Sequence, residues 1–399
     1  MPFVSYVLVK RSVNVCPWPL IISWIAALFG FITRSFLVIA ISLASIFILA
    51  QCGNSVLDND PIPYPSFDYT SVVCIARITE NSADWSLCIM DSIGNNMRKI
   101  VELTTNCSKP VRSRSGDKLL FSRYTFDYKY ELYSVNTDGS NLTLIDRSDF
   151  YCGNPDWSPD DKYIVYVRGV DHYWNSSDLV LYNTSEKTHK TLNVIGDVKH
   201  NPKFSPNGKQ ILYCAEIKAD TIYMHSHRNH HIYKIDVNGK NNKLIIKEAS
   251  APLWSPQGDK IVYYTTGIDG SSQISVANAD GSGQKQLTTS VSPGWWDTGF
   301  PRDGNGNPKW TPDGQKIVYV SHENEKSEIF IMDVDGSNKI RLTKAEVHDQ
   351  DPEITPNGQY ILYTSRRLDN TDCGIAIMTL DGKNQRILSK IGIYPIACK

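Results

Sequence analysis

The chain has 399 residues, 41 Lys plus Arg against 42 Asp plus Glu, and a formal net charge of −1. Hydrophobic residues make up 41% of it, which is enough for a buried core and excludes a generally disordered protein. The balanced charge and the short basic runs argue against a nucleic-acid-binding protein.

Residues 1–52 form an apolar N-terminal segment with Lys10, Arg11 and Arg34 and no acidic residue. Its second apolar stretch, Phe36–Ala50, has the length of a signal-peptide core and follows a positive charge. We therefore expect the rest of the chain to be exported and to lie at the periplasmic or extracellular face of a membrane.

The apolar stretch ends in Leu49-Ala50-Gln51-Cys52, which resembles the lipobox of bacterial lipoproteins. The resemblance implies cleavage before Cys52 and lipidation of that cysteine. Gln51 departs from the Gly, Ala or Ser usual in that family, so an uncleaved membrane anchor and cleavage without lipidation remain alternatives. Residues 53–69 are rich in proline and are predicted to be a stiff tether.

Residues 70–399 contain a repeated motif. One copy, at 307–319, has the sequence NPKWTPDGQKIVY; related copies begin at 154, 201, 251 and 351, and a degenerate copy begins at Pro110. The first prolines of these six copies lie 44 to 56 residues apart, which is the period of a propeller blade.

Each repeat predicts four strands. A Pro-Asp-Gly type of turn leads into a strand rich in β-branched and aromatic residues, such as 316–320. A further strand, such as 328–333, ends in an Asp-Gly hairpin turn and is followed by a last strand, such as 339–343. Each repeat is therefore predicted to be a four-stranded antiparallel blade.

The two ends of the repeat region are predicted to share one blade. Strands expected at 72–77, 86–91 and 99–103 precede the first copy and lack an inner strand, and residues 393–398 supply one. Pairing the two ends closes the ring and leaves no open edge. We predict an all-β, seven-bladed propeller over 70–399, with six blades as the alternative.

With five near-intact motifs, residues 70–398 resemble the TolB-type propeller repeats, which are relatives of the WD repeats. The resemblance implies the fold and no single function, because such blades also occur beside prolyl peptidases and in oligogalacturonate lyases. TolB proteins carry a separate N-terminal α/β domain that contacts partners. We expect only the short tether ahead of the blades here, so the role of TolB does not follow from the resemblance.

Histidines cluster in the connection between the second and third strands of the fourth blade, where we expect a candidate binding or metal site. The clustered residues are His225, His227, His230 and His231. His200 and His348 precede inner strands and are expected to face the same side, near the central channel. Imidazoles bind several transition metals. The alternative is a solvated polar loop.

The long connection at 291–306 is a second candidate binding site. It holds Trp295, Trp296, Phe300 and Arg302. These residue types are enriched at binding hot spots, and the alternative is an insertion that packs its own aromatics on the rim.

Among the cysteines, the matching positions of Cys107 and Cys152 on adjacent blades suggest a disulfide, and Cys74 and Cys88 are expected on neighbouring strands.

The leading prediction is a binding platform for a protein or glycan partner at the cell envelope, held to the membrane by a lipid or an apolar anchor. We expect a binding module more than an enzyme. An enzyme needs converging titratable groups in a pocket, whereas a binding module needs a patch of aromatic and Arg residues, and the sequence contains hints of both. The alternative is a metal-dependent polysaccharide lyase, similar to oligogalacturonate lyases, or a hydrolase. No cofactor is expected apart from a transition metal at the histidine-rich face.

Overall fold

The computed structural model describes residues 71–76, 85–103, 107–171, 176–216, 230–266, 271–289, 305–322, 326–344, 347–366 and 373–398. All of them fall in one compact unit, Ser66–Lys399. The predicted anchor (1–52) and tether (53–69) lie outside the described residues, so these domain boundaries stay a prediction. Among the described residues, no helix is long and apolar enough to cross a membrane.

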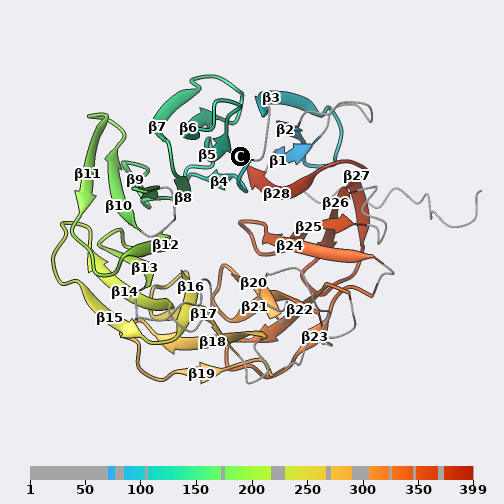
Figure 1. Cartoon of the computed structure of the whole chain (residues 1–399). Helices are drawn as coiled ribbons and strands as arrows, with labels where there is room; N and C mark the ends of the chain where they lie inside the picture. The colour runs from blue at the N-terminus through green and yellow to red at the C-terminus, as the bar shows by residue number, and fades with distance from the viewer. Residues whose placement is uncertain are drawn as a thin grey trace, which may run out of the picture. The chain divides into compact units, whose positions relative to one another are not determined.

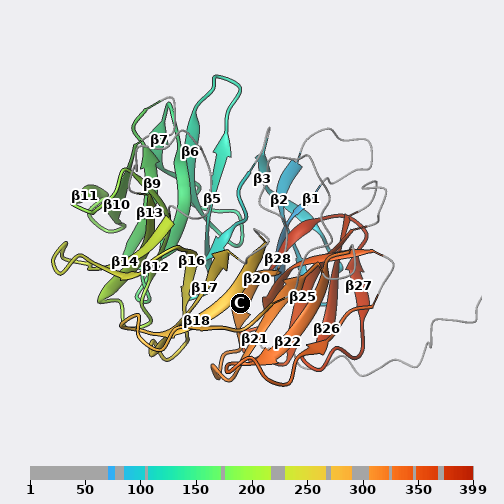
Figure 2. The same cartoon turned by 60° about the horizontal axis from the view of Figure 1, so that its bottom comes forward.

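The described residues form seven four-stranded antiparallel sheets, arranged as the blades of a ring (Figure 1). The prediction of a seven-bladed propeller is confirmed, and the six-bladed alternative was wrong. In each blade the first strand named below lies nearest the centre of the ring, and the strands run between its two faces (Figure 2).

The first four blades have the following strands, from the centre outwards. Blade 1 consists of β28 (Ile393–Cys398), β1 (Ser71–Ala76), β2 (Trp85–Asp91) and β3 (Arg98–Leu103). Blade 2 consists of β4 (Val111–Arg112), β5 (Lys118–Tyr124), β6 (Tyr130–Asn136) and β7 (Thr143–Ser148). Blade 3 consists of β8 (Cys152–Trp157), β9 (Tyr163–Gly169), β10 (Ser177–Asn183) and β11 (Thr188–Leu192). Blade 4 consists of β12 (Val198–Phe204), β13 (Gln210–Glu216), β14 (His230–Asp236) and β15 (Lys243–Ile246).

The remaining three blades repeat this order. Blade 5 consists of β16 (Ala249–Trp254), β17 (Lys260–Thr266), β18 (Ser272–Asn278) and β19 (Lys285–Gln286). Blade 6 consists of β20 (Asn305–Trp310), β21 (Lys316–Ser321), β22 (Glu328–Asp333) and β23 (Ile340–Arg341). Blade 7 consists of β24 (His348–Ile354), β25 (Tyr360–Arg366), β26 (Cys373–Thr379) and β27 (Arg386–Ser389).

The Ser or Thr of each repeat fixes the turn between the first two strands of its blade. In blade 4 the Ser205 hydroxyl accepts a hydrogen bond of 3.0 Å from the backbone N–H of Gln210. Thr311 does the same for Lys316 in blade 6, also at 3.0 Å. A side-chain oxygen thus replaces a backbone partner inside the turn, which explains why the repeat keeps a hydroxyl residue there.

The residue before the first proline of the motif has a left-handed backbone in six blades. Its φ lies between 47° and 56° at Asn154, Asn201, Ala251, Asn307, Asp351 and Tyr394. The pairing of the inner strand with the next strand shifts at the same place, as it does between His200 and Lys203. Each shift is a β-bulge, a feature that re-aims side chains.

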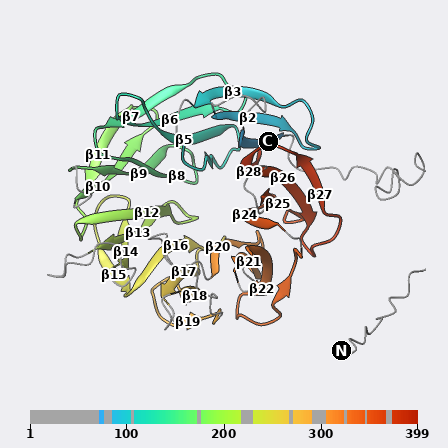
Figure 3. The ribbon, with the colours of Figure 1, turned by 45° about the vertical axis from the view of Figure 1, so that its right-hand side comes forward.

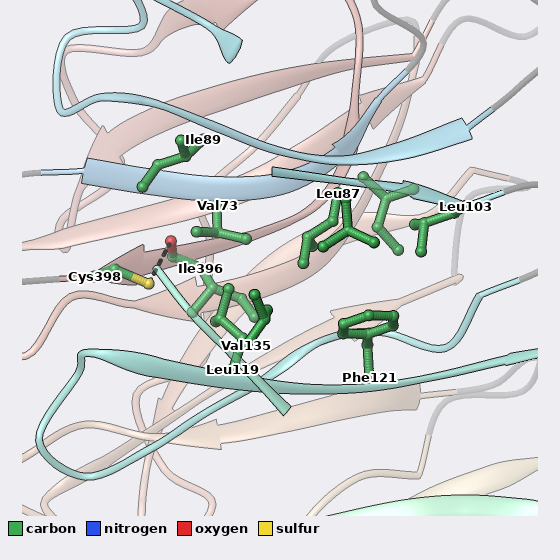
Figure 4. Close-up of a cluster of buried hydrophobic side chains, with 11 residues drawn as sticks. Val73, Leu87, Ile89, Leu103, Leu119, Phe121, Val135, Ile396 and Cys398 are labelled. Carbon is green, nitrogen blue, oxygen red and sulfur yellow. Dashed lines mark hydrogen bonds between the residues drawn. The ribbon is translucent and has the colours of Figure 1, made fainter. Parts of the chain in front are cut away.

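The hydrophobic core is divided among the seven junctions between neighbouring blades. One cluster fills the junction of blades 1 and 2, where Val73, Leu87 and Ile396 meet Leu119 and Phe121 (Figure 4). All five side chains are buried. Equivalent clusters lie at the other six junctions, so burial of apolar surface holds each blade against its two neighbours.

The ring is closed by the last strand. β28 pairs with β1, with Ser71 opposite Cys398 and Val73 opposite Ile396. Figures 1 and 3 show the red C-terminal strand beside the blue strands of blade 1. The edge of β1 is therefore hydrogen-bonded instead of open, as the sequence predicts.

Candidate functional site

A central channel runs through the inner strands and contains a cavity of about 630 Å³. All seven blades line it. The contribution repeats at one position, the residue after the first proline of each motif: Val111, Asp156, Lys203, Leu253, Lys309, Glu353 and Ile396. The bulge before this position changes the direction of the side chains that follow it. It varies between apolar, basic and acidic residues inside an otherwise uniform motif, which is the signal that the sequence analysis missed.

The lining of the channel is positively charged. Its basic residues are Lys109, Arg112, Arg114, Lys203 and Lys309, and its acidic residues are Asp156 and Glu353. Among the described residues that line the channel, five positive charges minus two negative charges leave an excess of three. Low-dielectric walls strengthen the field of like charges that line a cleft, so the channel favours an anionic ligand.

Glu353 stands between two lysines from other blades. Its Oε2 lies 2.9 Å from Nζ of Lys309 and 3.7 Å from Nζ of Lys109. Burial acts to raise the pKa of Glu353, but the two lysines outweigh it and hold the pKa at about 2. Burial, with Lys309 nearby, lowers the pKa of Lys109 to about 8. A single carboxylate therefore serves two ammonium groups.

Asp156, the other acid of the channel, already has its partners. Its Oδ2 accepts a hydrogen bond of 2.8 Å from the backbone N–H of Phe204, and its Oδ1 lies 3.4 Å from Nζ of Lys203. These contacts join blade 3 to blade 4. Arg114 is exposed at the channel, where a ligand can reach it without displacing an ion pair from the core.

An open groove of about 900 Å³ lies between blades 3 and 4, away from the channel. Tyr163 and Leu181 contribute apolar surface to it, and Lys190 and Asp236 contribute opposite charges. In the part of the chain that the structure describes, two blades contribute to this groove, and its charges do not share one sign. It therefore offers less basis for selecting a ligand than the channel does.

A second group of polar side chains lies in blade 4, on the face opposite its Ser-Pro turn. Glu216 at the end of β13 is paired with His230 at the start of β14. His200 on β12 is paired with Cys214, two residues before Glu216. Because side chains two residues apart in a strand share a face, this register places His200, Glu216 and His230 together.

The ligand atoms of these three residues all lie within 4.8 Å of one another. Nε2 of His230 is 2.6 Å from Oε1 of Glu216. The rings of His200 and His230 are edge to face, with centroids 5.4 Å apart. The three side chains are half-buried. Both histidines could be predicted from the sequence, but Glu216 could not, because the strand register brings it to them.

The other predicted histidines lie elsewhere. Nδ1 of His231 accepts a hydrogen bond of 3.0 Å from the backbone N–H of Glu248, and alternation along β14 directs it away from His230. In blade 7, Nδ1 of His348 accepts a hydrogen bond of 3.1 Å from the backbone N–H of Ser327. Burial lowers the pKa of His348, and nearby positive groups, of which His322 has the largest effect, lower it further.

The following predicted residues lie outside the described residues: Cys52, His225, His227, Trp295, Trp296, Phe300 and Arg302.

The described cysteines are free thiols, so the predicted bridge between Cys107 and Cys152 is not formed. The reason is that the two lie in different cores: Cys107 packs at the junction of blades 1 and 2, and Cys152 at the junction of blades 2 and 3. Cys74 and Cys88 are directly opposite each other on β1 and β2, as expected for neighbouring strands.

Comparison with known proteins identifies the repeat. The family profile of the TolB beta propeller domain matches residues 122–393. The Tol-Pal system protein TolB of Francisella tularensis subsp. mediasiatica (strain FSC147) is 26% identical over 264 residues, which cover 64% of this chain and 55% of that protein. The chain thus spans about half the length of the curated relatives it matches.

Two solved structures share the fold. TolB from Acinetobacter baumannii has a TM-score of 0.50 and 16% identity, over 68% of this chain and 63% of that chain. An oligogalacturonate lyase in complex with manganese has a TM-score of 0.57 and 13% identity, over 81% of this chain and 86% of that chain. At such low identity these likenesses show a common architecture and no common activity.

Proposed function

The chain belongs to the TolB beta propeller domain family, and from this premise we propose that it is an exported propeller that binds a protein partner at the cell envelope. The observation that carries the proposal is the channel, whose lining includes one residue of variable chemistry from each of the seven blades. Its positive excess suits a partner segment with acidic side chains. The curated relatives are named as Tol-Pal system proteins, which supports an envelope protein as the partner.

We further propose that residues 1–52 anchor the propeller to the membrane, with Cys52 as the lipidated residue and 53–69 as the tether. The lipobox-like sequence supports this part of the proposal. Two acyl chains on one cysteine anchor a protein stably, whereas a single chain gives only reversible binding. Trp295, Trp296, Phe300 and Arg302 are proposed as additional partner contacts, on the basis of their residue types.

The test is partner capture from cross-linked cells that express the full chain. We expect one envelope protein to be recovered with the wild type and less of it with Arg114→Glu, which reverses a charge at the channel. Lys309→Met removes a positive charge inside the channel and should act in the same direction. Lys240→Glu is the matched control, because Lys240 is exposed in a turn of blade 4 and does not line the channel.

Equal recovery with wild type, Arg114→Glu and Lys309→Met would overturn the channel as the binding site. Recovery of a polysaccharide in place of a protein would favour the glycan alternative. Charge at an interface acts mainly on association and its salt dependence. Recovery of the partner with the wild type should therefore fall as the salt concentration is raised. The same fall should be smaller for Arg114→Glu.

A second candidate is a metal-dependent polysaccharide lyase or hydrolase. The observation in its favour is the convergence of His200, Glu216 and His230 in blade 4, since an enzyme needs titratable groups that meet at one place. Depolymerisation of acidic polysaccharides by the purified chain, lost on His230→Ala, would replace the binding proposal with this one.

A further inference from the structure

We propose that His200, Glu216 and His230 bind a divalent transition metal of the zinc type in blade 4. The inference goes beyond the proposed partner binding and does not depend on it. It rests on three neighbouring strands, β12, β13 and β14, each of which supplies one ligand to the same face of one sheet.

The chemistry of the three groups matches zinc. Two imidazoles and one carboxylate are the protein ligands of a common class of zinc site, which keeps a further coordination position for water or another ligand. Together they carry one negative charge when both histidines are neutral, which favours a cation over an anion. The thiol of Cys214 faces the same side, but it is buried in the apolar core between blades 4 and 5 and does not belong to the group of ligand atoms within 4.8 Å of one another.

The distances suit a metal after small side-chain rotations. Zinc bonds to nitrogen and oxygen are about 2.0–2.2 Å long, so two ligands of a tetrahedral ion are separated by about 3.4 Å. The atoms of this cluster are separated by between 2.6 Å and 4.8 Å. Metal entry would lengthen the short contact between His230 and Glu216 and draw His200 closer. The ladder that holds the three strands need not move.

The surroundings favour a bound ion as well. The side chains of His230 and Glu216 are 16% and 26% exposed, so an ion can enter from solvent and still bind in a partly desolvated place, where charge interactions are stronger. Lys199, the neighbour of His200, is buried and its Nζ donates to the backbone carbonyl of Asp197 at 3.1 Å. Alternation along β12 places Lys199 on the opposite face of the sheet from His200.

An ion pair between His230 and Glu216 alone is the competing explanation, and it accounts for the contact of 2.6 Å. A metal site would also include His200, whose ring stands edge to face with that of His230, with the centroids 5.4 Å apart. The two explanations differ in a measurable way, because an ion pair needs only two of the residues and a metal site needs all three.

The experiment is a Zn²⁺ titration of the full chain in detergent, purified without a histidine tag and stripped with a chelator, followed by competition with a chromophoric chelator. We expect one ion per chain for the wild type. His200→Ala, His230→Ala and Glu216→Gln should each weaken binding about 100-fold or more, since loss of even an outer partner of a ligand costs about 10–100-fold. Co²⁺ should give the visible absorption of a four-coordinate ion, lost in the same variants.

His231→Ala is the matched control, because it removes an imidazole one residue away on the other face of β14. Its Zn²⁺ affinity should equal that of the wild type. Glu216→Gln keeps the shape of the side chain and guards against loss through misfolding, which far-UV circular dichroism checks for each variant. Absence of Zn²⁺ binding at micromolar concentration, or binding unaffected by His200→Ala, would overturn the proposal.

Discussion

Lys309 on β20 and Glu353 on β24 occupy the same position of consecutive repeats and form an ion pair of 2.9 Å inside the channel. Lys109, which precedes the inner strand of blade 2, approaches the same carboxylate from another blade. The variable position of the motif thus has two roles. Its charged members set the charge of the channel and connect blades through polar contacts. Its apolar members, Val111, Leu253 and Ile396, pack against the cores between blades.

The first prediction concerns pH. The pKa of Glu353 falls from its ordinary 4.5 to about 2 in the folded protein, so the unfolded state takes up this proton first as the pH falls. The stabilisation is therefore complete above pH 4.5 and is lost towards pH 2. At pH 7, Glu353→Gln should lower the free energy of unfolding by about 2 kcal/mol.

Urea unfolding between pH 2 and pH 7 measures this effect. The difference between Glu353→Gln and the wild type should shrink as the pH falls below 4.5. Glu186→Gln, at an exposed position in blade 3, should show no comparable difference. A difference at Glu353 that did not vary with pH would contradict the charge-based account.

The second prediction concerns closure of the ring. Ile396 on β28 is 3% exposed and packs in the core between blades 1 and 2 (Figure 4). Ile396→Ala removes buried apolar volume and should lower the free energy of unfolding by about 2–5 kcal/mol. Ile387→Ala is the matched control, because Ile387 on β27 is 57% exposed. Similar urea midpoints for the two variants would refute closure through this core.

The third prediction concerns the bulge of blade 5. Ala251 has φ of 48°, a region that costs a non-glycine residue about 1 kcal/mol. Ala251→Gly should raise the free energy of unfolding by about that amount. Ala249→Gly, two residues earlier in β16 and buried, should lower it by about 0.5–1 kcal/mol. Opposite shifts in thermal midpoint are expected, and shifts of the same sign would count against strain at Ala251.

The fourth prediction concerns the anchor. Cys52→Ala removes the proposed lipidation site and should move the protein from the membrane to the soluble fraction after cell fractionation. Labelling with a radioactive fatty acid should be lost with it. An unchanged membrane fraction together with an unchanged apparent mass would instead support the uncleaved anchor.

The fifth prediction concerns the aromatic connection. Replacing Trp295 and Trp296 together by alanine should reduce partner capture at least about tenfold, because truncating hot-spot residues costs about 2 kcal/mol or more. Thermal stability checks the competing account, in which these aromatics pack on the rim. A fall in melting temperature with full partner capture would favour packing.

The fold could be predicted because its determinants recur. Each repeat contains three local signals: a Ser or Thr in a turn, a proline and an Asp-Gly type of hairpin. These signals recur every 44 to 56 residues, and because each repeat predicts four strands, the number of repeats gives the number of strands. The sequence Tyr394-Pro395-Ile396 identified the closing strand because Pro395 follows Pro352 after 43 residues, an interval close to those between the other copies. Pairing of β28 with β1 bears this out.

The candidate sites were harder to predict because they depend on register. His230 and His231 are adjacent in the sequence, yet alternation along β14 separates them, while Glu216 joins His230 from another strand. The disulfide prediction failed for a similar reason. Cys107 and Cys152 hold equivalent repeat positions, but equivalent positions face different junctions, so their similarity separates them instead of bringing them together.

The sharing of blade 1 between both ends of the chain has a consequence for biosynthesis. β1, β2 and β3 are made early, but the inner strand of their blade is β28, the last element described. Until β28 emerges, β1 keeps an open edge while six later blades fold beside it. A product that lacks β28 would keep the edge of β1 open, and an open edge can pair with another chain. Completion of synthesis therefore removes a site at which the newly made protein could aggregate.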